Sequence, residues 1–149
     1  MFEKRLIAGW GDMDFNSHMR NTAFLDKSAD MRMIFFSENG FPMDEFIRLK
    51  IGPVVLKDEV EYFREIRLLE ELRATLAIAG LSEDGTNFIM RNEFWKDEKK
   101  LAAKVTSACG WLDLSIRKLA LPPEALLAAL RLIPQADDFR VLPSRLKQR

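Results

Sequence analysis

Alternation of apolar and polar residues through the middle of the chain constrains the fold more than any other feature. A period of two is typical of strands that bury one face, because successive side chains point to opposite sides of a sheet. Polar stretches at residues 82–85 and 96–99 are short enough to be tight turns between neighbouring strands, which predicts an antiparallel meander. The alternating segments are residues 52–66, 72–80, 86–95 and 101–114.

A segment with a helical period precedes these strands. Residues 22–38 place their apolar side chains on an arc broader than half of the helix circumference, so we expect a helix that is largely enclosed by other structure. Gly40 and Pro42 follow as helix-ending residues. Arg32 projects into the apolar arc. Because a buried charge needs a partner, we expect Arg32 to pair with an acid from another segment rather than to bind substrate.

Both ends of the chain fit around this arrangement. Residues 2–10 alternate like a further strand, and a short helix is predicted to begin at Pro122–Pro123, since proline is favoured in a first helical turn. We expect residues 134–149 to be frayed. The 149 residues predict one α+β domain, in which an antiparallel sheet of about five strands is wrapped around one long central helix.

Composition excludes several classes of partner. Lysine plus arginine and aspartate plus glutamate each number 23, so the chain has no basic surplus for nucleic acid or for an anionic membrane. No apolar run approaches the length of a membrane span, and the first residues lack the apolar core of a signal peptide. The single cysteine, Cys109, lies within a strand pattern and is expected to be a buried structural residue. These features favour a cytoplasmic location.

Residues 11–21, with the sequence GDMDFNSHMRN, hold the side chains best suited to chemistry. His18 is the only histidine of the chain, so a serine or cysteine nucleophile would depend on it alone. The chain has no known metal-ligand spacing and no glycine-rich phosphate loop, and we expect neither a metal nor an organic cofactor. Asp14 remains as a carboxylate that could activate water or attack a carbonyl group directly.

The position of Asp14 just before the helix allows two interpretations. A helix N-terminus presents unpaired backbone N–H groups and the positive end of a dipole, which can hold the oxyanion of an acyl-transfer reaction. Alternatively, Asp14 or Asn21 only caps the helix and His18 only packs, because aspartate and asparagine are common capping residues. Spacing alone favours the capping interpretation.

The motif resembles the signature of the hotdog-fold acyl-CoA thioesterases of the 4-hydroxybenzoyl-CoA thioesterase type. Residues 52–81 and 87–95 also resemble strands of that family, and the likeness covers residues 3–115. The hotdog fold consists of a long helix held in an antiparallel sheet, which agrees with the predicted layout. The residues that carry the likeness are Gly11, Asp12, Asp14, His18, Asn21, Phe24, Leu25 and Arg32.

The resemblance implies roles for particular residues. Asp14 would be the catalytic carboxylate, acting either as a base toward water or as a nucleophile, and the backbone N–H of Asn21 would polarise the thioester carbonyl. His18 would orient the loop by hydrogen bonding, whereas Asp12 would be a turn residue. The residues expected to contact the acyl group, in addition to their place in the core, are Phe24, Tyr62 and Phe88.

The resemblance also implies an activity and partners. We expect hydrolysis of an acyl-CoA or acyl-carrier thioester by a homodimer or by a tetramer built from two dimers. The alternative is a hotdog module that binds acyl-CoA or an acyl carrier without catalysis. A hydratase or dehydratase is less consistent with the sequence, because such enzymes usually carry a histidine on the helix and residues 22–38 contain none. The sequence does not reveal the acyl group.

Overall fold

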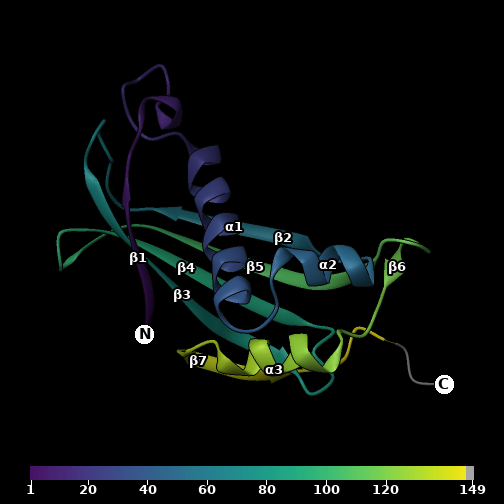
Figure 1. Ribbon diagram of the computed structural model, residues 1–149. Coiled ribbons are helices and arrows are strands. Elements are labelled where there is room, and N and C mark those ends of the chain that lie inside the picture. The colour runs from purple at the N-terminus through teal and green to yellow at the C-terminus, as the bar shows by residue number, and fades with distance from the viewer. Residues whose placement is uncertain (147–149) are drawn as a thin grey trace.

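The computed structural model describes residues 1–146 and contains one curled sheet with helices against it (Figure 1). The strands are β1 (Phe2–Ile7), β2 (Ile51–Tyr62), β3 (Glu71–Ser82), β4 (Phe88–Lys96), β5 (Lys100–Asp113), β6 (Lys118–Leu119) and β7 (Gln135–Leu142). The helices are α1 (Asn21–Glu38), α2 (Met43–Leu49) and α3 (Glu124–Leu132), with a 3-10 turn at Trp10–Asp12. The predicted α+β class is confirmed.

The main path of the sheet follows the order β1-β3-β4-β5-β2, and each neighbouring pair on this path is antiparallel. The predicted meander of β3, β4 and β5 is confirmed by their pairing along the strands. β6 adds to β5, and β7 adds to β3 as a parallel strand. Within residues 1–146 the sheet therefore has seven strands rather than about five, and it is not wholly antiparallel.

β1 and β7 share one edge of β3. β1 pairs with Glu71–Leu76, and β7 pairs with the part of β3 that follows, up to Ser82. The expectation of a frayed tail is wrong for residues 135–142, because their backbone completes an otherwise open sheet edge and Leu142 is buried. The part of that expectation that falls on residues 147–149 lies outside the described residues.

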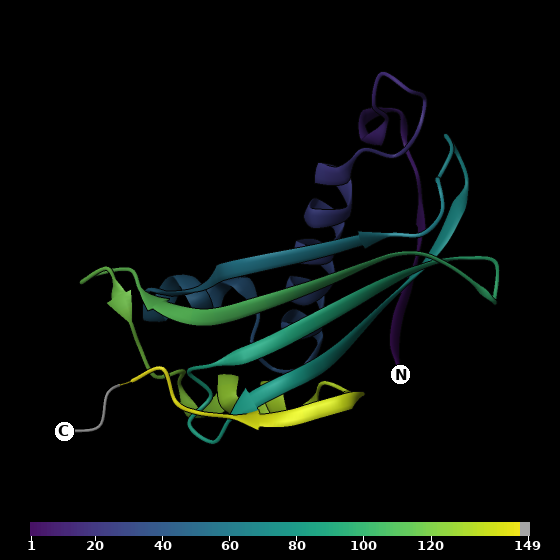
Figure 2. The ribbon, with the colours of Figure 1, turned by 180° about the vertical axis from the view of Figure 1, so that it is seen from behind.

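Helix α1 lies against one face of the sheet, and Figure 2 shows the strands in front of it when the molecule is seen from behind. Its enclosure is only partial, because Asp26, Ala29 and Ile34 remain exposed on the side away from the strands. A stripe at helical spacing is buried instead, as expected for a helix packed on one face. The buried residues of α1 are Ala23, Phe24, Ser28, Met31, Arg32, Phe35 and Phe36.

Some element boundaries differ from the sequence-based prediction. The first strand ends at Ile7 rather than at residue 10, where the 3-10 helix begins. β2 ends at Tyr62, so residues 63–66, predicted as the end of this strand, belong instead to the connection at 63–70 that leads to β3. Helix α2 has no counterpart in the prediction, because it is short and buries Phe46 alone among its residues, which gives no recognisable helical period.

Arg32 is buried, and within residues 1–146 no carboxylate contacts it directly. Its Nε atom donates to Oδ1 of Asn92 at 2.9 Å, and a terminal nitrogen donates to Oγ of Ser107 at 2.8 Å. Ser107 in turn donates to Asp58, so the expected acid is reached through a hydroxyl group. Burial lowers the pKa of the Arg32 guanidinium, and the nearby Cys109 and Asp58 offset part of that change. The direct ion pair predicted for Arg32 is therefore wrong, because an amide and a hydroxyl occupy its donors.

Cys109 is a structural residue, as predicted. The thiol is buried, and this burial raises its pKa to about 11, since a thiolate is disfavoured away from water. A neutral thiol at ordinary pH is a poor nucleophile. The observation leaves the carboxylates of the N-terminal loop as the candidates for chemistry.

Candidate functional site

The loop that precedes α1 is closed on itself by hydrogen bonds. The backbone N–H of Asp14 donates to the carbonyl oxygen of His18 at 2.8 Å, and Met13 forms a bridge with Met19. The Oδ1 atom of Asp14 accepts the backbone N–H groups of Asn16 at 2.8 Å and of His18 at 3.1 Å. These bonds hold the exposed Asp14 carboxylate in a defined orientation.

Asp12 secures the base of this loop. Its Oδ2 atom accepts the backbone N–H of Gly9 at 2.8 Å and lies 3.1 Å from Nζ of Lys27. Partial burial raises the pKa of Asp12, but the Gly9 N–H and the Lys27 ammonium outweigh it and hold this pKa below its usual range. Arg20 donates its N–H to the Asp12 carbonyl oxygen at 2.8 Å and its guanidinium to that of Gly11. The Asp12 carboxylate is thus occupied, as a turn residue requires.

His18 connects the loop to the segment between β2 and β3. Its Nε2 atom lies 3.0 Å from Oε2 of Glu65. The following residue, Met19, donates its N–H to the carbonyl oxygen of Ile66 at 2.8 Å. Side chain and backbone therefore attach the loop to the same part of the chain, an arrangement that suits the predicted role of His18 in orienting the loop.

Helix α1 begins at Asn21, whose backbone N–H is unpaired within residues 1–146. Arg20 occupies the N-cap position and makes no side-chain cap, while Oδ1 of Asn21 accepts the N–H of Thr22 at 2.9 Å. In the described range 1–146, the backbone N–H of Asn21 has no hydrogen-bond acceptor. The capping interpretation of Asp14 is wrong, because its hydrogen-bonded oxygen serves the loop and not the helix.

A groove of about 410 Å³ brings the loop and the start of α1 together. Phe24 forms part of its wall, with its ring centroid 5.8 Å from that of Tyr62 and 5.3 Å from that of Phe94. Both aromatic contacts are edge-on, a favourable geometry for such rings. The groove thus combines an acid, a helix terminus and an aromatic wall. The predicted residues that line it are Asp14, His18, Asn21, Phe24 and Tyr62.

Phe88 does not belong to this groove. It is buried and stacks on Trp111 with a centroid distance of 4.9 Å. Phe94, which does touch the groove wall, lies roughly 20 Å away along β4 at the usual strand rise. The structure therefore removes Phe88 from the residues that could contact an acyl group, because alternation identifies the buried face of a strand but not which end of it faces the site.

The groove residues that follow β2 were not predicted from the sequence. They belong to the connection at 63–70, whose first four residues fall within the strand predicted at 52–66. The adjacent aromatic pair Tyr62–Phe63 breaks the alternation and is the signal that could have placed the strand end there. The missed residues of this connection are Phe63, Arg64, Glu65 and Ile66.

The described residues contain neither a candidate metal site nor a candidate membrane span. Within residues 1–146, no three His, Cys, Asp or Glu side chains lie close enough together to hold a metal ion. In the same range no helix combines the length and the apolar character needed to cross a membrane. No curated protein sequence matches the chain at a significant level.

The sequence matches a family model, the Thioesterase-like superfamily, over residues 8–130. The chain belongs to this superfamily. The match contains the loop, helix α1 and the groove, and it ends within α3, before β7 begins. The part of the chain that the superfamily shares is therefore the part that builds the candidate site.

Solved structures support this membership at the level of the fold. A gentisyl-coenzyme A thioesterase is 18% identical, with a TM-score of 0.76, and the alignment covers 87% of this chain and 99% of that one. A 1,4-dihydroxy-2-naphthoyl-CoA thioesterase from Synechocystis is 16% identical, with a TM-score of 0.77 and coverages of 88% and 96%. A hypothetical protein from Staphylococcus aureus in complex with CoA is 18% identical, with a TM-score of 0.78 and coverages of 91% and 87%. The chain shares the fold of these three proteins, two of which are named as thioesterases, and this supports the hotdog architecture.

Proposed function

We propose that the protein hydrolyses acyl-CoA thioesters to a carboxylate and free CoA. The observation that carries the proposal is that one groove holds both the Asp14 carboxylate and the start of α1, where the Asn21 N–H is unpaired within residues 1–146. An acyl-transfer site needs a group that delivers oxygen to the carbonyl carbon and a donor that holds the carbonyl oxygen. Membership in the thioesterase superfamily supports the same reaction.

In the proposed reaction the thioester carbonyl lies between these two groups. Its oxygen accepts the Asn21 N–H at the positive end of the helix dipole, which favours the negative charge that develops there. Asp14 either takes a proton from a water molecule that attacks the carbonyl carbon, or attacks that carbon itself and is released by water afterwards. In both routes the carbon–sulfur bond breaks, and the thiolate of CoA leaves and is protonated.

The loop prepares Asp14 for this role. Its Oδ1 atom is held by two backbone N–H groups, whereas Oδ2 has no hydrogen-bond partner in the range 1–146. The free oxygen keeps its lone pairs for a water molecule or for the substrate carbon. Because the bound oxygen fixes the carboxylate, little orientational freedom is lost when the substrate arrives.

The lining of the groove also indicates which acyl groups it could bind. Phe24 and Tyr62 give it aromatic walls, and partial burial raises the pKa of the Tyr62 hydroxyl. Two of the similar structures are named for the thioesterases of gentisyl-CoA and of 1,4-dihydroxy-2-naphthoyl-CoA. We therefore propose aromatic acyl-CoAs as the substrates to test first, in line with the resemblance to the 4-hydroxybenzoyl-CoA thioesterase type.

The proposed active form is a homodimer or a dimer of dimers joined through β2. Within residues 1–146 the outer edge of this 12-residue strand has no neighbouring strand, and a bare edge is a template for pairing with a second chain. Val55 and Leu56 are exposed on this strand. Gel filtration with light scattering tests the assembly, and a monomer at assay concentration contradicts it.

A panel of acyl-CoAs assayed for release of free thiol tests the proposed activity. Asp14→Asn keeps the shape of the side chain and removes the base, so we expect kcat to fall by about 10²–10⁴, while thermal unfolding stays close to that of the wild type. Asp26→Asn is the matched control, because Asp26 is an exposed carboxylate of α1 outside the groove.

Two outcomes would contradict this assignment. An Asp14→Asn variant that keeps more than about a tenth of the wild-type kcat would show that another group does the chemistry, since loss of a general base is far more costly. Binding of acyl-CoA by the wild type with no release of thiol from any member of the panel would favour a module that binds thioesters without hydrolysing them.

A further inference from the structure

A second hollow opens beside the groove, at the connection between β2 and β3. Its volume is about 630 Å³, and it shares Phe63, Arg64 and Glu65 with the lining of the groove. A ligand in the groove can therefore continue past these three residues into the second hollow. We call it the basic hollow, because its lining contains the cationic residues Arg64, Arg67, Lys96 and Lys100.

The acids of the basic hollow are largely engaged by other groups. Glu65 lies 3.0 Å from the loop histidine, and Glu70 pairs with Lys96 at 3.2 Å. Lys96 also donates to the carbonyl oxygen of Glu65 at 2.9 Å, so it is already satisfied. Within residues 1–146, Arg67 and Lys100 form no ion pair with any carboxylate.

The remaining charges leave the hollow positive. Arg64 donates one N–H to the carbonyl oxygen of Leu101 at 3.1 Å, and within residues 1–146 it has no carboxylate partner. Asp97 is the lining acid that is not paired in the same range. Glu65 keeps its negative charge, because its partner His18 is charged only when protonated, so three cationic side chains, those of Arg64, Arg67 and Lys100, face two carboxylates. Such a surplus attracts phosphate groups, for which arginine offers paired N–H donors.

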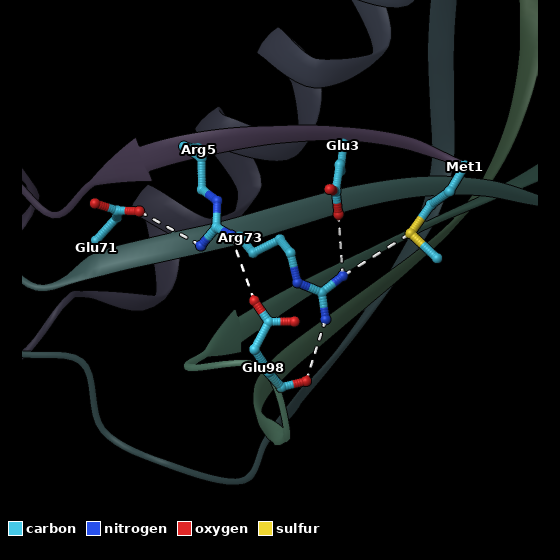
Figure 3. Close-up of polar contacts among 6 residues, drawn as sticks. All are labelled: Met1, Glu3, Arg5, Glu71, Arg73 and Glu98. Carbon is cyan, nitrogen blue, oxygen red and sulfur yellow. Dashed lines mark hydrogen bonds and ion pairs between the residues drawn. The ribbon is translucent and has the colours of Figure 1, made fainter.

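Cations on neighbouring strands differ from those of the basic hollow. Figure 3 shows Arg5 between Glu71 and Glu98, at 3.4 and 3.5 Å, and Arg73 against Glu3 at 3.1 Å. Each of these two arginines already faces a carboxylate, so each offers little to a further anion. These two arginines therefore differ from Arg64, Arg67 and Lys100, which within residues 1–146 have no carboxylate partner.

We propose that the basic hollow binds the phosphate groups of the CoA nucleotide while the acyl end of the same molecule lies at Asp14. This proposal rests on the proposed function, since it assumes a CoA thioester in the groove. The flexible pantetheine arm that joins the two ends of CoA must leave the groove, and the basic hollow is a neighbour that shares three residues of its wall. Arg64, Arg67 and Lys100 then select thioesters whose carrier bears phosphate groups.

Kinetics with two matched substrates test the site. The double variant Arg67→Gln/Lys100→Gln removes two of its free charges, and we expect KM for an acyl-CoA to rise about tenfold, because charge-assisted contacts to phosphate are lost. KM for the corresponding acyl-pantetheine, which lacks the nucleotide, should stay within about twofold, since it makes no such contact. Arg5→Gln is the control, because Arg5 is exposed and already paired with acids. Its KM values for both substrates should equal those of the wild type.

Direct binding separates this site from the hydrolytic activity. Adenosine 3′,5′-bisphosphate, which has the phosphates but no thioester, should bind the wild type in calorimetry, weaken with added salt and bind the double variant at least about fivefold more weakly. If that binding pattern is found but no thioester is cleaved, the site stands and the proposed hydrolysis fails. The proposed site would be overturned if the double variant raised KM equally for acyl-CoA and acyl-pantetheine, or if it bound the bisphosphate as tightly as the wild type. The assignment to CoA would also be overturned if the double variant raised KM for an acyl-carrier protein substrate and left KM for acyl-CoA unchanged.

Discussion

Asp12 and Asp14 are separated by one residue and have different surroundings. Asp12 is held by the Gly9 N–H and by Lys27, which leaves it no role toward a ligand. Asp14 is bonded through one oxygen to its own loop and lines the groove. The motif placed both acids near the helix, but residue type alone could not distinguish them. The distinction depends on Lys27, which only the folded helix brings to Asp12.

At Asn21 the structure separates the backbone from the side chain. The side chain accepts the Thr22 N–H, whereas the backbone N–H is free within residues 1–146. Asn21→Ala should therefore keep most of the turnover and lose about 1 kcal/mol of stability at most. Asn21→Pro removes the donor itself and should lower kcat by about 10²–10³, the usual loss for one oxyanion donor. Thiol release by the two variants is the measurement.

The backbone around Asn21 suits this test. Arg20 is extended, with φ −74° and ψ 156°, which is the conformation that a residue before proline prefers. Proline is also accepted at the first position of a helix. Circular dichroism should therefore find the proline variant folded. If it is folded and turns over at the wild-type rate, or if the alanine variant is as inactive as Asp14→Asn, the N–H of Asn21 is not the oxyanion donor.

Arg32 tests how the core holds a buried charge. Arg32→Leu leaves Asn92 and Ser107 without their donor, and we expect the free energy of unfolding in urea to fall by ~2–5 kcal/mol, since each buried unsatisfied group costs ~1–3 kcal/mol. Adding Asn92→Leu should restore part of the loss, because replacing both partners by apolar groups is much less costly. An Arg32→Leu variant as stable as the wild type would contradict the buried hydrogen-bond network.

Among the elements, the turn between β3 and β4 is joined to the segment after β7 through Asp84. Its Oδ1 atom accepts hydrogen bonds from the hydroxyl groups of Ser82 at 2.8 Å and of Thr86 at 2.7 Å. Its Oδ2 atom accepts the hydroxyl of Ser144. Although partial burial raises the pKa of Asp84, these donors and the Thr86 N–H lower it to about 2. One carboxylate thus fastens a turn and the end of the described chain together.

The depressed pKa gives a direction for the effect of pH. Asp84 has an ordinary pKa of 3.8 and a folded pKa of about 2, so its contribution is present above the ordinary value and is lost as pH falls through 2. Allowing for solvent screening, we expect ~1–2 kcal/mol. The difference in unfolding free energy between the wild type and Asp84→Asn should be larger at pH 6 than near pH 2. Glu83→Gln, an exposed neighbour, is the control, and a difference independent of pH would contradict the assignment.

Elements with a clear period could be predicted from the sequence, and elements without one could not. β3, β4, β5 and α1 were placed correctly, because their buried faces impose a period of two or of 3.6 on the residues. β7 was missed because the acids at 137–138 interrupt its alternation and its partner is a strand made much earlier in the chain. Pairing between such distant segments leaves no local signal.

At the scale of the whole molecule, one wall of the candidate site could be predicted from the sequence and the opposite wall could not. The motif supplied Asp14, His18 and Asn21, which are neighbours in the sequence as well as in space. The opposite wall comes from residues 63–66, and only the pairing of β2 with β5 and the reversal after Tyr62 bring that segment to the loop. No spacing rule links segments so far apart, and for the same reason the basic hollow was invisible in the sequence.

The shared edge of β3 has a consequence for the chain while it is being synthesised. β3 and its antiparallel neighbours are synthesised well before β7 leaves the ribosome. The part of the β3 edge that pairs with β7 is therefore unpaired during that interval. During that interval the edge can capture another nascent chain. A chain ending at Pro134 makes this state permanent, and in cell-free translation we expect it to sediment while the full-length chain stays in the supernatant. A truncated chain that remains in the supernatant would show that the edge is protected in another way. If the truncated chain sediments, β7 is the strand that prevents this edge from pairing with other chains during translation.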